Sequence, residues 1–250
     1  MAGSPARTPT GSWSNSGNAD GRRRRSGDGR PARDDYVSGN VPITIDELTV
    51  ADEPEPWAAI GFTLHGRTCI IGDVRIHLVG VNPEDKGLTG WSLREVRTTE
   101  LDGLPTATSD REPPDEPPTH ANGITGVDHV VAITPALERT VAGLEAAGLD
   151  LRRIRDEPTP AGAPRQAFFR LGATILEVVQ EPAEAIERGG VDRPAFFWGV
   201  ALVAPDLDQT VAALGDRVSE VRRAVQPGRR IATLRRSAGL SVPVALMTPG

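Results

Sequence analysis

Cysteine and lysine are almost absent from this chain of 250 residues: Cys69 is the only cysteine and Lys86 the only lysine. A single thiol excludes an intrachain disulfide and favours a reducing compartment, so we expect a cytoplasmic protein. No apolar run is long enough to cross a bilayer, so no membrane partner is expected. The formal net charge of -6 gives no attraction to nucleic acid or to an anionic membrane surface.

A segment that occurs twice dominates the second half of the chain. The two copies run from Gly126 to Pro182 and from Phe197 to Pro249. Each copy reads as an apolar strand, a helix, an arginine-rich strand and two further strands, which makes a βαβββ unit. A repeat of this size is one supersecondary unit that must bury its apolar face against a neighbour.

The helices of the two copies match position by position. Apolar residues at i, i+4 and i+7 predict one buried stripe on each helix. The stripe residues are Leu137, Val141 and Leu144 in the first copy and Leu207, Val211 and Leu214 in the second. We expect Pro135 and Pro205 at the first helical position, where the missing N–H of proline costs nothing.

The first half of the chain contains a weaker third copy. Its best alignment sets Gly72–Gly80, GDVRIHLVG, against Gly172–Gln180, GATILEVVQ. Before that segment, the sequence predicts a strand and a short helix in which Trp57 anchors the packing. The result is a shortened βαβββ unit.

Composition then divides the chain, and residues 1–40, rich in Gly, Ser and Arg without periodicity, predict a disordered tail. The other predicted segments are a shortened unit over 41–98, a proline-rich acidic linker over 99–124, and full units over 125–183 and 195–250. The fold class we predict is α+β, with tandem βαβββ units forming a cupped, barrel-like mixed sheet and helices outside. Three units leave one without an internal mate, so pairing within one chain and pairing across a homodimer both stay open.

The VDHVV strand that opens the second unit and the ILEVV strand that closes it resemble the vicinal oxygen chelate superfamily, and within it the glyoxalase-like domain proteins. The resemblance covers residues 126–249 well and 41–96 weakly. It implies that two units pair and that their sheets curve around a cup. Members include glyoxalases, extradiol dioxygenases, epimerases and fosfomycin-inactivating transferases, while metal-free members bind antibiotics or other small molecules.

The resemblance places metal ligands on the first and last strands of a unit, which here carry His129 and Glu177. Imidazole nitrogen and carboxylate oxygen suit a divalent ion such as Zn, Ni, Mn, Co or Fe(II). A carboxylate among apolar neighbours is costly to bury without a partner, which favours a role for Glu177. A lone histidine in an apolar strand is more often structural, so a structural and a functional His129 both stay open.

The last unit departs from this ligand pattern. Gly199 falls at the position of His129, and Ala245 or Val244 falls at the position of Glu177. None of the three can bind a metal. If the last two units pair, their cup keeps two protein ligands, fewer than a catalytic ion usually has.

The first unit offers replacements for the missing ligands. His77 aligns with Glu177, and Glu47 falls near the position of His129. A cup built from the first two units would collect all four side chains. The alternative is that His77 and Glu47 are ordinary strand residues.

Two classes of function follow for a small-molecule partner. Four converging ligands predict a metal-dependent lyase or isomerase of the glyoxalase type, which acts on a small oxygenated substrate through an enediolate-type intermediate with Glu177 as proton shuttle. An extradiol-type dioxygenase is a further alternative. Two converging ligands predict a metal-free, non-catalytic binding protein. Candidates for the pocket lining in either class are Phe168, Trp198 and Arg165.

Overall fold

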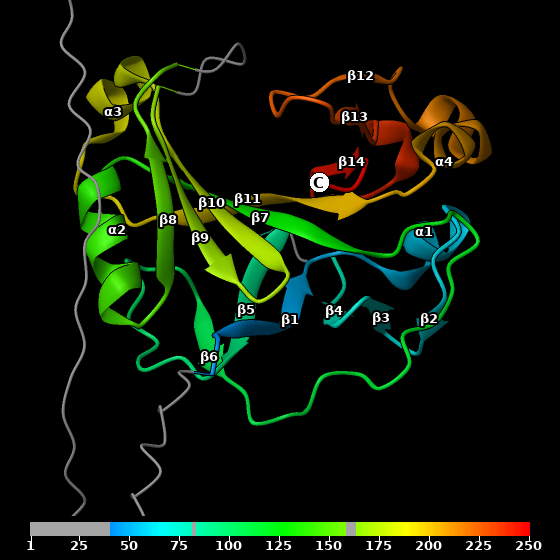
Figure 1. The fold of residues 1–250 in the computed structure, drawn as a ribbon, viewed down its shortest axis with the longest axis horizontal. Coiled ribbons are helices and arrows are strands. Elements are labelled where there is room, and N and C mark those ends of the chain that lie inside the picture. The colour runs from blue at the N-terminus through cyan, green and yellow to red at the C-terminus, as the bar shows by residue number, and fades with distance from the viewer. Residues whose placement is uncertain (1–40, 82–83, 159–163) are drawn as a thin grey trace, which may run out of the picture. The chain divides into compact units, whose positions relative to one another are not determined.

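The computed structural model describes residues 41–81, 84–158 and 164–250, and the predicted disordered tail lies outside them. The described residues form two mixed β-sheets with short helices (Figure 1). No helix in the described part of the chain is long and apolar enough to span a membrane.

The larger sheet has eight strands in the order β12-β13-β14-β11-β7-β10-β9-β8 and carries both copies of the repeat. Its strands are β7 (Gly126–Thr134), β8 (Asp150–Arg155), β9 (Gln166–Leu171), β10 (Thr174–Gln180), β11 (Phe196–Val203), β12 (Arg222–Arg223), β13 (Arg230–Thr233) and β14 (Val244–Met247). The opening strands β7 and β11 lie antiparallel in the middle, and the closing strands β10 and β14 run parallel to them. The second and third units therefore pair within one chain.

The smaller sheet has six strands in the order β2-β3-β4-β1-β5-β6. Its strands are β1 (Thr44–Val50), β2 (Leu64–His65), β3 (Thr68–Ile71), β4 (Val74–Leu78), β5 (Leu88–Arg94) and β6 (Thr106–Thr108). β1 to β4 form the shortened unit, and β5 lies antiparallel to β1 as β11 does to β7. β6, which falls within the segment predicted as linker, runs parallel to β5. β5 and β6 thus stand where the first and last strands of a fourth unit would, and they complete the first unit without a second chain.

The helices bury the stripes that the sequence predicts, except that Val211 is only partly buried. They are α1 (Pro54–Ala59), α2 (Leu137–Ala146), α3 (Ala183–Gly189) and α4 (Leu207–Leu214), with 3-10 turns at Gly215–Arg217 and Arg236–Ala238. The position expected for the two prolines is wrong, because Pro135 and Pro205 each lie two residues before their helix. In α4 the intervening Asp206 is the N-cap, and its side chain accepts a hydrogen bond from the Gln209 N–H at 3.0 Å.

The alignment of the first unit with the second is reproduced by the backbone. Gly72 and Gly172 both have a φ of 61° in the turn before the closing strand, a conformation that favours glycine. Glu47 of β1 pairs with Arg75 of β4 just as His129 of β7 pairs with Ile175 of β10. His77 and Glu177, two residues further along, are therefore equivalent positions.

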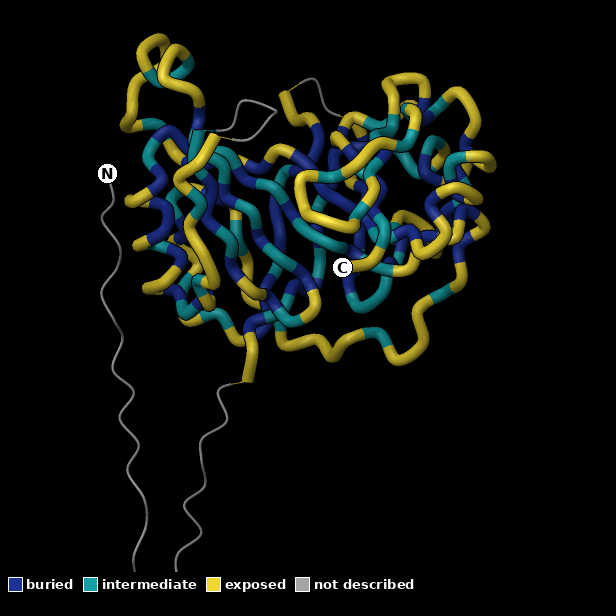
Figure 2. The backbone as a smooth tube through the Cα atoms, turned by 45° about the horizontal axis from the view of Figure 1, so that its top comes forward, coloured by how far each residue is buried: buried dark blue, intermediate teal, exposed yellow. Residues whose placement is uncertain are grey.

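One continuous core lies between the two sheets (Figure 2). Trp91 of the smaller sheet packs edge-to-face on Phe197 of the larger one, with ring centroids 5.0 Å apart. Along β10, Leu176 and Val178 are buried, whereas Ile175 and Glu177 alternate with them and face the other side. That other side is open, because the eight-stranded sheet ends in the edge strands β8 and β12 and does not close into a barrel.

Candidate functional site

A large cavity lies over the open face of the eight-stranded sheet. Its volume is about 1330 Å³, above the ~300–1,000 Å³ of a typical ligand pocket. Strands β8 and β9 line one side, and residues 222–231 line the other. Figure 1 shows β8 and β9 at one end of the sheet and β12 and β13 at the other. We call this cavity the cup.

Asp128 and His129, which are neighbours in sequence, both line the floor of the cup. His129 pairs with Ala201 of β11 and Val127 pairs with Leu202, so Asp128 is the extra residue of a β-bulge. A bulge turns a side chain that regular alternation would send to the opposite face. The His129 Nδ1 atom lies 2.8 Å from Asp128 Oδ2.

Asp128 is held in its ionised form by the two basic side chains that it contacts. Burial raises the pKa of Asp128, but hydrogen bonds from His129 and Arg229 and their charges outweigh burial and lower it. The Arg229 guanidinium donates to both carboxylate oxygens, at 2.5 and 3.2 Å. An ionised carboxylate only accepts hydrogen bonds, so the proton in this contact is on Nδ1 of His129.

Glu177 and Gln166 complete the floor of the cup. Glu177 Oε2 lies 3.6 Å from His129 Nε2, beyond hydrogen-bond distance. Gln166 Nε2 donates a hydrogen bond to the other oxygen, Glu177 Oε1. Gln166 is only 7% exposed, and its Oε1 has no hydrogen-bond partner among the described residues.

The structure does not bring together the four expected metal ligands. His129 and Glu177 meet in the eight-stranded sheet, whereas Glu47 and His77 occupy the equivalent places in the other sheet. Glu47 there pairs with Arg111 at 2.8 Å. Within residues 41–81, 84–158 and 164–250, no group of three or more His, Cys, Asp or Glu side chains is placed to hold a metal.

The third unit adds no metal donor to the cup. Ala245 pairs with Ala201 as Glu177 pairs with Val131, so strand register identifies Ala245, not Val244, as the counterpart of Glu177. At Gly199, a Cβ would lie 2.5 Å from the Pro243 carbonyl oxygen, which leaves no room for a side chain. The described residues thus offer His129 and Glu177, and two donors do not fit a catalytic metal held by three or more protein ligands.

In the smaller sheet, a buried ion cluster lies at the place that corresponds to the floor of the cup. Asp46, which is fully buried, accepts hydrogen bonds from three arginines and two serines. The donors are Arg75, Arg94, Arg111, Ser92 and Ser109. Sequence reasoning passed over Asp46; its only signal was an acid beside Glu47 in an otherwise apolar strand.

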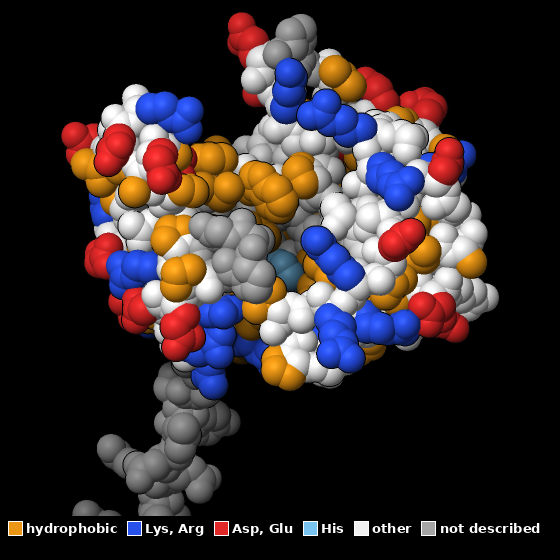
Figure 3. All heavy atoms as spheres, turned by 90° about the horizontal axis from the view of Figure 1, so that it is seen from above, with side chains coloured by type: hydrophobic (Ala, Val, Ile, Leu, Met, Phe, Trp, Pro, Cys, Tyr) orange, Lys and Arg blue, Asp and Glu red, His pale blue; other side chains and the backbone are white. Residues whose placement is uncertain are grey.

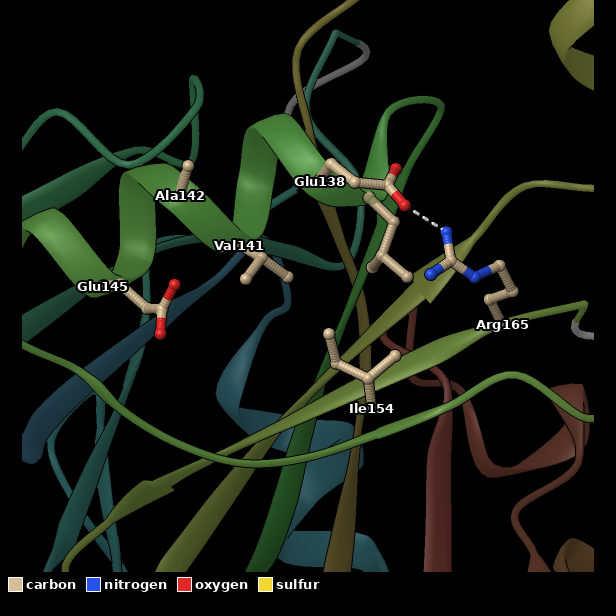
Figure 4. A pocket seen from close by; sticks show the side chains of 7 residues that line it. Glu138, Val141, Ala142, Glu145, Ile154 and Arg165 are labelled. Carbon is tan, nitrogen blue, oxygen red and sulfur yellow. Dashed lines mark hydrogen bonds and ion pairs between the residues drawn. The ribbon is translucent and has the colours of Figure 1, made fainter.

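The three residues predicted to line a pocket are dispersed. Phe168 lines the cup, with the Arg153 guanidinium 5.2 Å from its ring centroid. Trp198 is 51% exposed and is not among the residues that line the cup. Arg165 lies at a separate hollow of about 140 Å³ beside α2, where it pairs with Glu138 (Figure 4).

Comparison with known proteins identifies relatives by structure alone. No protein-family model and no curated protein sequence matches the chain. Methylmalonyl-CoA epimerase from Mycobacterium tuberculosis matches at 19% identity and a TM-score of 0.42, covering 52% of this chain and 91% of the epimerase. A Streptomyces coelicolor methylmalonyl-CoA epimerase variant in complex with 2-nitronate-propionyl-CoA matches at 22% identity and a TM-score of 0.41, covering 51% of this chain and 96% of the epimerase.

A longer match covers most of the chain. A fusion of a xylose isomerase-like TIM barrel with 4-hydroxyphenylpyruvate dioxygenase aligns at 13% identity and a TM-score of 0.53. The alignment covers 83% of this chain and 49% of the fusion protein, so the present chain spans about half the length of that relative. At this identity, the likeness concerns the fold.

Proposed function

We propose that this chain, which has the fold of the vicinal oxygen chelate superfamily, binds a small molecule in its cup, with His129 and Glu177 at the centre of the site. The observation that carries the proposal is their arrangement. His129 Nε2 and Glu177 Oε2 lie 3.6 Å apart on the floor of a cavity of about 1330 Å³. Polar groups that converge in a large cavity are typical of a ligand site.

The loss of donors in the third unit favours binding over metal-dependent chemistry. Gly199 and Ala245 stand where a second histidine and a second carboxylate would complete the ligand set. The backbone of Pro243 occupies the space that a side chain at position 199 would need. The cup therefore has one histidine and one carboxylate, half of the four side chains that this ligand set would contain.

A fragment screen by thermal shift tests this proposal. Fragments that bind the cup should raise the melting temperature of the wild type by several degrees, because a ligand at a hundred times its Kd stabilises a fold by about 2.7 kcal/mol. We expect the shift to disappear in Glu177→Ala and His129→Ala. His77→Ala, which alters the equivalent position of Glu177 in the other sheet, is the matched control. Shifts that persist unchanged in Glu177→Ala would place the ligand elsewhere and refute the proposal.

A metal-dependent lyase or isomerase of the glyoxalase type is the second candidate function. The contact between His129 Nδ1 and Asp128 favours it, since metal-ligating histidines usually donate their other N–H to a carboxylate. The measurement that separates the two candidates is metal content by mass spectrometry, on protein purified without chelators. Near-stoichiometric Zn, Ni, Mn, Co or Fe that is lost in Glu177→Ala and kept in His77→Ala would favour the enzyme. Metal-free protein that still binds fragments would favour the binding protein.

A further inference from the structure

The side walls of the cup are rich in arginine although the chain as a whole is acidic. The formal net charge of the chain is -6. The lining of the cup nevertheless contains six arginines against four carboxylates. The arginines are Arg153 and Arg155 of β8, Arg170 of β9, Arg222 and Arg223 of β12, and Arg229 just before β13. The cup is thus an electropositive region on an electronegative protein.

The arginines differ in whether the protein itself neutralises them. Arg229 is committed to Asp128, and Arg155 lies 4.0 Å from Glu157. Arg170, Arg222 and Arg223 are exposed, and none of them forms an ion pair with a described residue. They come from opposite edges of the sheet, so uncommitted positive charge stands on both sides of the cup. Figure 3 looks onto this side, with blue side chains around a hollow in which a histidine is visible.

The floor of the cup has the opposite hydrogen-bonding character. Two oxygen atoms of the floor accept no hydrogen bond from the described residues: Glu177 Oε2, which lies 3.6 Å from His129 Nε2, and Gln166 Oε1, an amide oxygen that can only accept. Gln166 Oε1 is buried without a donor, an arrangement that is rare and unfavourable in native proteins. A ligand that brings a donor to the floor would remove this deficit.

We propose, on the basis of the proposed small-molecule function, that the ligand is a small organic anion that also carries a hydroxyl or N–H donor. Its anionic group binds the guanidinium groups of Arg170, Arg222 and Arg223, because planar guanidinium matches carboxylate and phosphate oxygens. Its donor lies against the floor, where it reaches Gln166 Oε1. Donors on the walls and acceptors on the floor orient the ligand, and neither group alone would do so.

The probe is a matched set of fragments on common carbon skeletons, followed by ¹⁵N-resolved NMR of the full chain. Each skeleton is represented by a hydroxylated carboxylate or phosphate, the same anion without the hydroxyl, and a neutral hydroxylated amide or alcohol. We expect the hydroxylated anion to bind most tightly and the neutral compound most weakly. One ionic hydrogen bond accounts for about a tenfold difference in Kd.

Two variants separate the contribution of the walls from that of the floor. Arg170→Ala combined with Arg223→Ala should weaken both anions about equally, by roughly tenfold or more. Gln166→Met keeps the length of the side chain but removes its amide. This variant should lose the preference for the hydroxylated anion, while its affinity for the hydroxyl-free anion stays unchanged. Arg236→Ala removes an exposed arginine outside the cup, and it should change neither the affinity for the anions nor the preference for the hydroxyl. Unchanged melting temperatures establish that the variants fold.

The outcomes also separate this inference from the function on which it rests. Neutral fragments that bind the cup as tightly as the anions would overturn the inference and leave the proposed function standing. A preference for the hydroxyl that survives in Gln166→Met would overturn the assignment of Gln166. If no fragment perturbs the resonances of His129 and Glu177, both the inference and the proposed function fail.

Discussion

His129 owes its place in the candidate site to its neighbour in sequence, Asp128. The β-bulge turns Asp128 onto the open face, where Arg229 holds it ionised and it receives the Nδ1 proton of His129. The contact with Asp128 leaves Nε2 as the ring nitrogen on the side of Glu177, 3.6 Å from Oε2.

Replacement of Asp128 by alanine should change the tautomer of His129. At a pH at which the imidazole is neutral, we expect ¹⁵N shifts that report the proton on Nδ1 in the wild type and a mixture of the two neutral tautomers in Asp128→Ala. Asp150→Ala, which removes an exposed carboxylate from β8, is the control. A histidine spectrum that is identical in Asp128→Ala and the wild type would show that Asp128 does not orient the ring.

His120 is a second histidine with a defined state, and it lies away from the cup. It is 3% exposed; its Nδ1 accepts from the Thr63 N–H at 3.1 Å, and its Nε2 lies 2.9 Å from the Ile70 carbonyl oxygen. Burial lowers the pKa of His120, although the contact with Ile70 acts in the opposite direction. Protonation would also remove the acceptor that Thr63 uses.

Stability should therefore fall as His120 is driven to protonate. The folded-state pKa lies below the unfolded value of 6.5, so the contribution is complete above that pH and is lost as pH falls toward the folded-state pKa. Urea unfolding at pH 7.5 and pH 5.0 should show a drop of up to about 1.4 kcal/mol per pH unit, and this drop should shrink in His120→Asn. The exposed His65 provides a control in His65→Asn. An equal drop in the wild type and His120→Asn would contradict the assignment.

Among the elements, β1 carries the buried ion network of the smaller sheet. Asp46 of β1 forms ion pairs with Arg75 and Arg94 of the neighbouring strands. It also pairs with Arg111 and accepts a hydrogen bond from Ser109, both in the segment after β6. Arg94 also donates to the Arg111 carbonyl oxygen at 2.5 Å. These hydrogen bonds hold residues 109–111 against the face of the smaller sheet that corresponds to the cup side of the larger sheet.

Asp46→Asn should destabilise the protein and release that segment. Removal of one partner from a buried ion network typically costs about 3–5 kcal/mol, because the arginines then lack a counter-charge. We expect lower stability in urea and faster hydrogen exchange over residues 106–112. Asp115→Asn, in an exposed part of the same segment, should behave as the wild type.

The acid response of Asp46 gives an independent measure of the network. Burial raises its pKa, but hydrogen bonds from Ser109 and Arg111 and the nearby arginine charges outweigh burial and lower the pKa below 3.8. The stabilisation is therefore present above that value and is lost as pH falls through the lower folded-state pKa. Below pH 4, the wild type should lose stability more steeply than Asp46→Asn. Parallel curves would exclude this network as the cause.

At the scale of the whole molecule, the two sheets share a single core. Buried residues of both sheets form one continuous cluster, and Trp91 meets Phe197 across it. A shared core couples the stability of the cup to a sheet that contributes no residue to its lining. The smaller sheet therefore acts as a support for the larger one.

Phe197→Ala should accordingly weaken the whole molecule and not one sheet. Truncation of a buried phenylalanine costs about 3–5 kcal/mol, and tryptophan fluorescence and far-UV circular dichroism should still report one coincident transition. Phe196→Ala, which alters the adjacent side chain that is 41% exposed, should cost far less. Two separate transitions in either probe would show that the sheets unfold independently.

Local patterns were sufficient to predict the repeated units. The i, i+4, i+7 stripes and the alignment of His77 with Glu177 depend on residues close together in sequence. The structure reproduces the alignment and buries the stripe residues except Val211, which is partly buried. α3 and β6 were not predicted. β6 has only three residues, and its strand character comes from pairing with β5.

The composition of the candidate site could be predicted only in part. The resemblance pointed to His129 and Glu177 on the opening and closing strands of one unit, and the structure sets their side chains 3.6 Å apart. The arginine-rich strand in each copy was visible in the sequence, whereas Gln166 and Asp128 had no comparable signal, and a bulge brings Asp128 into the cup. The grouping of Glu47 and His77 with His129 and Glu177 required the first two units to share a sheet, which they do not.

The sequence by itself determined the βαβββ units and the strand positions that carry polar side chains, because strand period, helix period and turn glycines are local properties. Only the tertiary structure decided which units pair, since every unit presents an equivalent opening strand to which another can bond. That choice paired the second unit with the third, which left a cup with two metal-type donors, and it paired the first with the remnant formed by β5 and β6. With both sheets buried in one core, the open face of the larger sheet forms the cup, and the corresponding place in the smaller sheet carries the ion network around Asp46.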